Sequence, residues 1–337
     1  MELAMSKWII RFPLNVLSWG LGLVGIAALT LTAMIATPLE RLPELTSISK
    51  AARAVDRSTM PPLSRFSARD GTELAYRHYP ARGPSSGKIA ILVHGSSGSS
   101  VAVHGLADAL AARGVETYAP DIRGHGGSGS RGDVGFIGQL ENDMADFVAV
   151  VRNTSPAEPL TLIGHSAGGG FALRVAGSQV QDLFSRTVLL APYLGHDAPT
   201  NRPESGGWAK ADIPRFLGLT ALAKLGIDCC EGLPTLAFAV AANSERILNP
   251  TYSYRLMRNF ATRSYQLDLA AARHPVTLIS GANDELMLAD KYADAVHAVS
   301  PSVEVKLIDG VDHMGIVGNA QGVAAVADYV ANARIGS

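Results

Sequence analysis

The sequence is poor in charged residues and in cysteine, and neither sign of charge is in excess. Charged residues make up 18% of the 337 positions, with 29 Lys and Arg against 30 Asp and Glu, and the formal net charge is -1. Proteins that bind nucleic acid usually carry a basic surplus, so this balance gives no electrostatic basis for a nucleic-acid partner. Hydrophobic residues make up 47% of the chain, which excludes a disordered protein. The length fits one large domain or two small ones.

The two cysteines, Cys229 and Cys230, are neighbours in the sequence. Two adjacent thiols cannot form the disulfide framework of a small secreted domain, and they are too few for a multi-cysteine zinc site. Free cysteine is among the most buried residue types. We therefore predict two core cysteines without a redox role.

The N-terminal region contains a long apolar run. No charged residue occurs between positions 12 and 39, and the 21 residues from Val16 to Ala36 are nearly all apolar. As a helix this segment extends about 32 Å, enough to cross a hydrocarbon layer of about 30 Å. The sequence therefore predicts an uncleaved, single-pass N-terminal anchor whose partner is the lipid bilayer.

Two other roles for this segment are open. The apolar core of a cleaved signal peptide has about 7–15 residues, fewer than here, and the stretch from Ala33 to Ala36 is a poor cleavage site. A cleaved signal peptide is thus one alternative to the anchor. The other is a helix that packs on the protein itself or on a second copy of it. The sequence does not specify the oligomeric state. Positive charge near the two ends of the segment favours the cytoplasmic side for the rest of the chain. Lys7 and Arg11 precede the segment, and Arg41, Lys50, Arg53 and Arg57 follow it.

Beyond the apolar segment, strand-like and helix-like runs alternate. Apolar runs of strand length, such as Lys88 to His94 (KIAILVH), are separated by helix-compatible runs such as 101–113. This alternation is typical of the α/β class, in which helices cover both faces of a mostly parallel sheet. The interval 193–274 breaks the alternation, and a structureless loop of that length is rare in a compact domain. We therefore predict a helical insertion over one end of the sheet.

The predicted division of the chain follows from this pattern. An anchor and a polar connector occupy 1–60, a core occupies 61–192 and 275–337, and the insertion occupies 193–274.

One pentapeptide, Gly164-His165-Ser166-Ala167-Gly168, directly follows an apolar strand run and directly precedes a helix-compatible run. It is the only Gly-x-Ser-x-Gly in the chain. A serine on such a sharp turn has its hydroxyl exposed at the end of a sheet, and the flanking glycines let neighbouring backbone come close. We predict that Ser166 is a nucleophile; the alternative is a Gly-rich turn with a passive serine.

A nucleophilic serine needs a base, and the base needs an orienting carboxylate. On a strand–turn–helix scaffold these partners follow the serine in the order acid, then histidine, each after a late strand. The strand-like run 276–280 is followed by Asp284 and Glu285, and the run 303–308 is followed by His313. We predict His313 as the base and Asp284 as the acid, because the turn directs one of the two neighbouring carboxylates inward. Glu285 is the alternative acid.

Acyl transfer also needs N–H donors for the developing oxyanion. One is expected from the residue after the nucleophile, Ala167, and the other from the loop after the KIAILVH strand. That loop reads His94-Gly95-Ser96-Ser97-Gly98, and we predict Ser96 as the donor. A plain strand-to-helix turn is the alternative, since small residues suit it equally.

Five segments of the chain resemble motifs of the α/β-hydrolase family. They are ILVHGSSG, APDIRGHGGSG, GHSAGG, LISGAND and DGVDHMG, and the resemblance runs from about Ser64 to Val330. Within the family the chain is similar to the monoacylglycerol-lipase and lysophospholipase-like branch. The resemblance implies Ser166 as nucleophile, Asp284 as acid, His313 as base, and an insertion that caps an acyl pocket.

Three departures from related branches narrow the expected activity. Ser166 occupies the position of the Asp nucleophile in relatives that cleave epoxides or carbon–halogen bonds. Ser96 and Ser97 interrupt the three-glycine loop of the hormone-sensitive-lipase branch, and Ala167 replaces the Trp of proline-specific aminopeptidase relatives. The resemblance thus implies a serine esterase for small lipophilic esters, with neither metal nor organic cofactor. The apolar N-terminal segment lies outside the family pattern, and its own length and composition add the predicted membrane anchor. A thioesterase or amidase with the same triad and a catalytically silent, membrane-tethered binding module are the alternatives.

The implied cap leads to a prediction about its own side chains. Its Leu-rich stretches, 216–225 and 233–240, either line the apolar acyl pocket or hold the insertion together.

Overall fold

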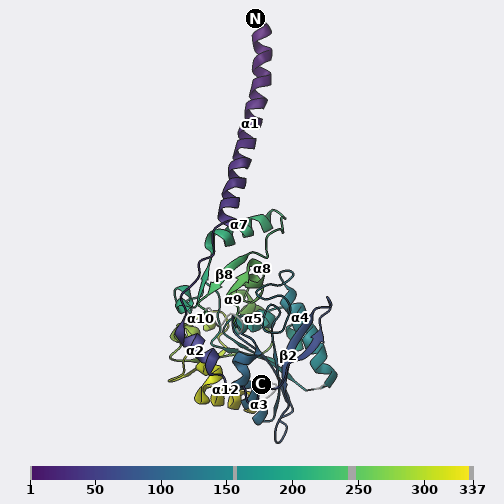
Figure 1. Cartoon of the computed structure of the whole chain (residues 1–337), viewed down its shortest axis with the longest axis vertical. Helices are drawn as coiled ribbons and strands as arrows, with labels where there is room; N and C mark the ends of the chain where they lie inside the picture. Colours follow the sequence, from purple (N-terminus) through teal and green to yellow (C-terminus); the bar gives the residue numbers. More distant parts are fainter. Residues whose placement is uncertain (1, 155–157, 242–247, 334–337) are drawn as a thin grey trace.

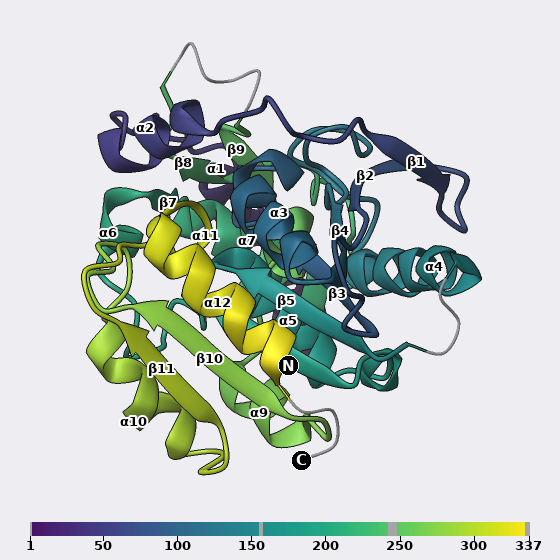
Figure 2. The same ribbon diagram turned by 90° about the horizontal axis from the view of Figure 1, so that it is seen from below.

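The core of the protein is an eight-stranded sheet, parallel over most of its width (Figures 1 and 2). The computed structural model describes residues 2–154, 158–241 and 248–333. The strand order is β1-β2-β4-β3-β5-β6-β10-β11, with parallel pairing from β4 to β11 and antiparallel pairing of β2 with both neighbours. The strands are β1 (Ser64–Ser67), β2 (Glu73–Tyr79), β3 (Lys88–Val93), β4 (Val115–Pro120), β5 (Leu160–His165), β6 (Arg186–Leu190), β10 (Val276–Gly281) and β11 (Glu304–Ile308). The predicted mostly parallel sheet is confirmed.

Helices cover both faces of this sheet, which explains why its central strands are apolar along their whole length (Figure 2). On one face, α3 (His104–Ala112) packs against α12 (Ala320–Asn332), and their side chains share a buried cluster that includes Leu106 and Val326. The buried cluster of the other face includes Phe147 and Phe171. Helices that contribute to it include α4 (Gln139–Thr154), α5 (Ala167–Ala176), α9 (Tyr265–Ala271) and α10 (Tyr292–His297).

The parallel strands bring three distant loops to one end of the sheet. In the register, His165 of β5 lies beside Leu190 of β6, and Gly281 of β10 lies beside Ile308 of β11. The loops that follow β5, β10 and β11 therefore leave the same edge, where sites of parallel α/β sheets are commonly found.

The N-terminal helix, α1 (Glu2–Ile35), extends away from the rest of the protein (Figure 1). Among the described residues, it is the one helix long and apolar enough to cross a membrane by length and composition, and no residue of its apolar window Ser18–Ile35 is buried. The region predicted as a polar connector has structure of its own. A second helix, α2 (Thr46–Ala54), forms within it and buries Ile48 against the core.

The chain between β6 and β10 is not wholly helical, contrary to the prediction. It contains a three-stranded antiparallel sheet, β7-β8-β9, as well as helices. The described elements are α6 (Glu204–Gly207), β7 (Ala209–Ala211), α7 (Ile213–Lys224), β8 (Pro234–Phe238), β9 (Thr251–Ser253), α8 (Tyr254–Asn259) and α9. Periodicity did not reveal the strands because a run as short as PTLAF in β8 fits a buried helix segment equally well.

The prediction of core cysteines is wrong. Cys229 and Cys230 are both exposed, because they lie in the turn that joins α7 to β8 rather than on an element that faces the core. Their sulfur atoms are 3.1 Å apart.

Candidate active site

Ser166 occupies a strained turn between β5 and α5. Its backbone angles, φ 55° and ψ -120°, lie in a region that L-residues seldom adopt. Three backbone hydrogen bonds hold this conformation. The N–H of Ser166 donates to Leu190 O at 2.9 Å, and the carbonyl of Ser166 accepts from the N–H groups of Gly170 and Tyr193 at 3.0 Å each.

The two glycines of the pentapeptide are required by close backbone contacts. A Cβ on Gly164 would collide with the carbonyl of Gly168, and a Cβ on Gly168 would collide with the carbonyl of His94. The Gly-x-Ser-x-Gly spacing therefore allows β3, β5 and α5 to meet tightly at Ser166.

His313 and Asp284 form a buried pair. The distance between His313 Nδ1 and Asp284 Oδ2 is 2.8 Å, and the side-chain exposures are 2% and 0%. The other carboxylate oxygen of Asp284 accepts hydrogen bonds from the N–H groups of Leu286 and Met287, both at 2.8 Å. The carboxylate is thus fixed from both sides.

The environment keeps Asp284 ionised. Burial is the largest influence on its pKa and raises it, but the charge and hydrogen bond of His313 and the two backbone N–H groups together outweigh burial, so the pKa lies below its ordinary value. An anion therefore faces Nδ1 of His313, the arrangement that orients an imidazole and stabilises it when protonated.

The neighbouring carboxylate, Glu285, has a different contact. Its Oε2 accepts a hydrogen bond from the backbone N–H of His313 at 3.0 Å. The carbonyl of His313 accepts from Nε2 of His165 at 3.0 Å, and the His165 and His313 rings are 4.9 Å apart. Because His165 directly precedes Ser166, this contact brings the loop of His313 to the turn of Ser166.

The structure also brings the loop after β3 to Ser166. A Cβ on Gly95 would lie 3.2 Å from the Cβ of Ser166, so the segment that carries Ser96 passes directly against the turn. Ala167 is the first residue of α5, and the first N–H groups of a helix have no intrahelical acceptor.

The insertion supplies contacts to this loop that the sequence did not reveal. Trp208 Nε1 donates a hydrogen bond to Ser96 Oγ at 2.9 Å, and the N–H of Ser97 donates to Tyr252 Oη at 2.5 Å. Tyr252 Oη is also 2.5 Å from Nε2 of His125. The contacts join residues more than 100 positions apart, which no local pattern encodes. The one available signal was that Trp208 is the single tryptophan beyond the first 19 residues.

Three further histidines near the turn are buried and have structural hydrogen bonds. Burial lowers the pKa of His94 and His125, and it lowers that of His165 to about 3. Nε2 of His94, for example, accepts from the N–H of Ile122 at 3.1 Å. These rings are neutral near pH 7.

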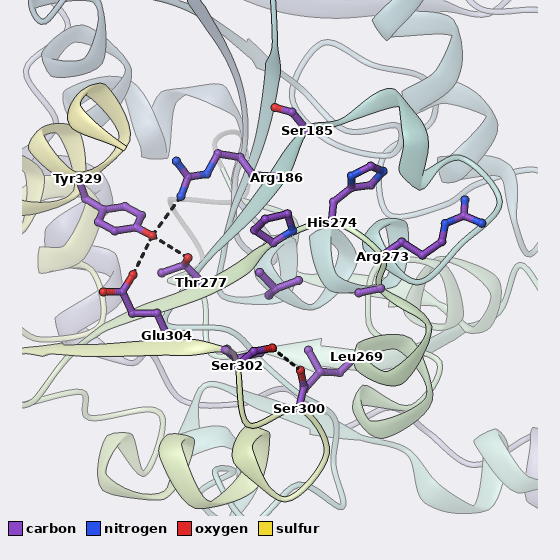
Figure 3. Close-up of a pocket in the computed structure, with 14 residues that line it drawn as sticks. Ser185, Arg186, Leu269, Arg273, His274, Thr277, Ser300, Ser302, Glu304 and Tyr329 are labelled. Carbon is purple, nitrogen blue, oxygen red and sulfur yellow. Dashed lines mark hydrogen bonds between the residues drawn. The ribbon is translucent and has the colours of Figure 1, made fainter. Parts of the chain in front are cut away.

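A cavity of about 450 Å³ lies at the other end of the sheet (Figure 3). Arg186, Val276 and Glu304, which line it, begin strands β6, β10 and β11. In Figure 3 the Tyr329 hydroxyl contacts Arg186, Thr277 and Glu304, at 3.1, 2.7 and 2.9 Å. Because Ser166 follows the carboxyl end of β5, this cavity is not part of the candidate site. Across residues 2–154, 158–241 and 248–333, no three His, Cys, Asp or Glu side chains group as metal ligands.

A mostly parallel sheet with a serine on a strand-to-helix turn and an Asp–His pair after its last strands defines the α/β-hydrolase fold. The family model described as serine aminopeptidase, S33, matches residues 84–317. That match covers more than half of the chain, and the protein belongs to this family of α/β hydrolases.

Three similar proteins illustrate the relationship. A monoacylglycerol lipase of Mycolicibacterium smegmatis is 32% identical over 111 residues, which are 32% of this chain and 39% of the lipase. A soluble variant of monoglyceride lipase from Saccharomyces cerevisiae shares the fold with a TM-score of 0.59 and 20% identity, over 82% of this chain and 95% of that one. A membrane phospholipase A, described as a bacterial virulence factor, has a TM-score of 0.53 and 17% identity, over 96% and 99%.

Sequence similarity to the curated relatives is partial. The chain matches 39% of the length of the M. smegmatis lipase and 20% of the length of an uncharacterized Escherichia coli protein to which it is 33% identical.

Proposed function

We propose that the protein is a serine hydrolase that cleaves carboxylic esters of lipophilic, monoacylglycerol- or lysophospholipid-like substrates through an acyl-enzyme. The observation that carries the proposal is the buried 2.8 Å contact between His313 Nδ1 and Asp284 Oδ2, beside the strained turn of Ser166. The lipase relatives support an ester substrate.

In the proposed reaction, His313 takes the proton of Ser166 as the serine oxygen attacks the ester carbonyl. Asp284 orients the imidazole and stabilises the imidazolium. The N–H groups of Ala167 and Ser96 bind the oxyanion of the tetrahedral intermediate. His313 then protonates the departing alcohol, and a water molecule activated by the same ring hydrolyses the acyl-enzyme and frees Ser166.

The proposal includes a location at a membrane. The exposed apolar window Ser18–Ile35 of α1 supports a single-pass anchor, and the positive charges that follow it support a catalytic domain on the cytoplasmic side. An enzyme held at the bilayer meets lipophilic esters where they are concentrated. The insertion acts as a cap, a role supported by the hydrogen bond that Trp208 donates to Ser96 and the one that Tyr252 accepts from Ser97.

A fluorophosphonate that reacts with activated serines tests the proposal. Full-length protein in detergent is expected to carry the label on Ser166, located by peptide mass spectrometry, and Ser166→Ala is expected to carry none. Folded protein that stays unlabelled would instead identify a silent binding module. Rates on matched ester, thioester and amide substrates separate an esterase from the other two hydrolases.

A further inference from the structure

Helix α7 presents an apolar side to solvent close to the end of α1. Ile213 and Leu217, one helical turn apart, are 56% and 51% exposed, and Leu225 and Ile227 in the following turn are 68% and 44% exposed. We call these four residues the α7 surface. Leu217 and Leu225 belong to the 216–225 stretch, whose role in lining an acyl pocket stays a prediction.

Charge is almost absent from this part of the chain. Between residues 213 and 227 the charged side chains are Arg215 and Lys224. Arg215 is buried and donates to the backbone carbonyls of Ile35, Thr37 and Pro234. Lys224 is exposed at the end of α7, where a long side chain can extend its ammonium group to lipid headgroups.

Close packing fixes α7 against the last turn of α1. A Cβ on Gly218 would lie 3.0 Å from Cγ1 of Ile35 and 3.3 Å from Cβ of Met34, so the glycine lets the two helices touch. A polar contact adds to the packing, because the Thr37 hydroxyl lies 2.9 and 2.7 Å from the two carboxylate oxygens of Asp212, the N-cap of α7.

These contacts set the direction of α7. In Figure 1, α1 runs away from the body of the protein, and α7 lies across its base. A bilayer crossed by α1 over Ser18–Ile35 therefore has its boundary at the level of Met34 and Ile35, where α7 packs. A helix with one apolar side lies in the plane of such a boundary with that side about 5–10 Å deep.

We propose that the α7 surface lies in the interface of the bilayer that α1 crosses, as a second membrane contact that holds the catalytic domain in one orientation. This inference rests on the proposed membrane anchoring. The bilayer, rather than a second copy of the chain, is the occupant because the exposed residues belong to the segment that packs against the last turn of α1, and lipid surrounds that helix at this depth.

The test uses the full-length chain in phosphatidylcholine–phosphatidylglycerol nanodiscs. A fluorophore that reports polarity (NBD) is attached to one introduced cysteine, in a background in which the exposed Cys229 and Cys230 are changed to serine. Leu217→Cys is the test position, and Leu21→Cys, within α1, is the lipid control. Leu267→Cys is the water control, since Leu267 is a 71% exposed leucine on α9, which packs against α5.

The inference predicts blue-shifted emission and quenching by doxyl-labelled lipid at Leu217 and Leu21, and neither at Leu267. Quenching at Leu21 without quenching at Leu217 would overturn the role of α7 and leave the anchor intact. An unquenched Leu21 would overturn the anchor and this inference together. A blue shift at Leu217 without lipid quenching, in nanodiscs that hold two copies, would assign the surface to a protein contact and overturn the inference.

A functional readout complements the depth measurement. Leu217→Asp is expected to lose hydrolysis of long-chain esters dispersed in vesicles while retaining the rate on a short, water-soluble ester. Leu267→Asp is the matched control and is expected to retain both rates. Equal rates of Leu217→Asp and Leu267→Asp on the vesicle substrate would contradict the inference.

Discussion

Trp208 of the insertion donates a hydrogen bond through Nε1 to Oγ of Ser96 in the loop after β3, at 2.9 Å and across 112 positions of sequence. Trp208 is 5% exposed, and its ring is tilted against that of Phe238 with the centroids 5.5 Å apart. The N–H of the next loop residue, Ser97, donates to Tyr252 of the same insertion, and Ser97 has a φ of +65°. The insertion therefore holds the conformation of the loop that we propose binds the oxyanion.

Trp208→Phe tests this positioning role because it keeps an aromatic ring and removes the N–H. The lost hydrogen bond is worth about 1 kcal/mol. If this energy is added to the activation free energy, kcat decreases roughly fivefold, while KM stays nearly unchanged. Ser96→Ala removes the acceptor and is expected to have the same effect, and the double variant no larger one. Additive losses in the double variant would show that the two side chains act independently.

Asp284 and Glu285 are expected to differ in their effect on catalysis. Asp284→Asn removes the anion that faces the imidazole and is expected to lower kcat strongly, but about tenfold to a hundredfold less than His313→Ala. Glu285→Gln keeps an oxygen for the N–H of His313 and is expected to change kcat by less than about tenfold. Steady-state rates on a chromogenic ester measure all three. A severe loss in Glu285→Gln with normal activity in Asp284→Asn would transfer the acid role to Glu285.

Gly168→Ala is expected to destabilise the fold. The added methyl group would meet the carbonyls of His94 and Val93, and such overpacking costs about 1–3 kcal/mol. Gly318→Ala is the matched control, because a Cβ at that position has no neighbour within 4 Å. Thermal unfolding in detergent should show a lower midpoint for Gly168→Ala only. Equal midpoints would contradict the close contact at the serine turn.

Stability is expected to fall on acidification because the buried histidines remain neutral in the fold. Burial, followed by the charge of His313, lowers the pKa of His165 from 6.5 to about 3. Below pH 6.5 the unfolded chain binds a proton at this residue and the folded chain does not. The free energy of unfolding therefore decreases between pH 6.5 and about 3, by up to roughly 1.4 kcal/mol per pH unit for this group. Urea unfolding at several pH values gives the free energy of unfolding as a function of pH. This free energy should depend less steeply on pH in His165→Gln than in the wild-type protein, and an equal dependence would show that His165 does not cause the loss of stability.

Two N-terminal deletions should separate the anchor from the fold. Removing residues 2–32 leaves Thr37 and its contact with Asp212, and it is expected to give a folded protein that cleaves short esters normally and long-chain, membrane-dispersed esters more slowly. Removing residues 2–60 also deletes Leu45, whose N–H donates to Ala239 O at 2.9 Å, and the buried Ile48. This longer deletion is expected to lower the thermal midpoint. Equal midpoints would show that the α2 region does not stabilise the core.

The sequence predicted the parts of the molecule that depend on local patterns. Apolar runs of strand length located β3, β5 and β10, and the glycines around Ser166 identified the turn because close backbone contact restricts those positions to glycine. Chain order then indicated Asp284 and His313, which the structure places 2.8 Å apart.

The remaining features depend on contacts between distant segments. The short apolar run of β8 becomes a strand because β7 and β9 pair with it, and Cys230 is exposed because its turn lies on the surface. The contact of Gly218 with Ile35 joins the insertion to the N-terminal helix. None of these pairings leaves a periodic signal in the sequence.

We propose above all that Ser166 forms an acyl-enzyme with a lipophilic ester. Its most direct test is rapid acid quenching of the full-length protein during turnover of a long-chain monoacylglycerol in nanodiscs, followed by peptide mass spectrometry. We expect a mass increase equal to the acyl group on the peptide that contains Ser166. In Ser166→Ala we expect no such increase and a loss of turnover of roughly 10⁴-fold or more. Undiminished turnover in Ser166→Ala, or an acyl group on another residue of the wild-type chain, would contradict the proposal.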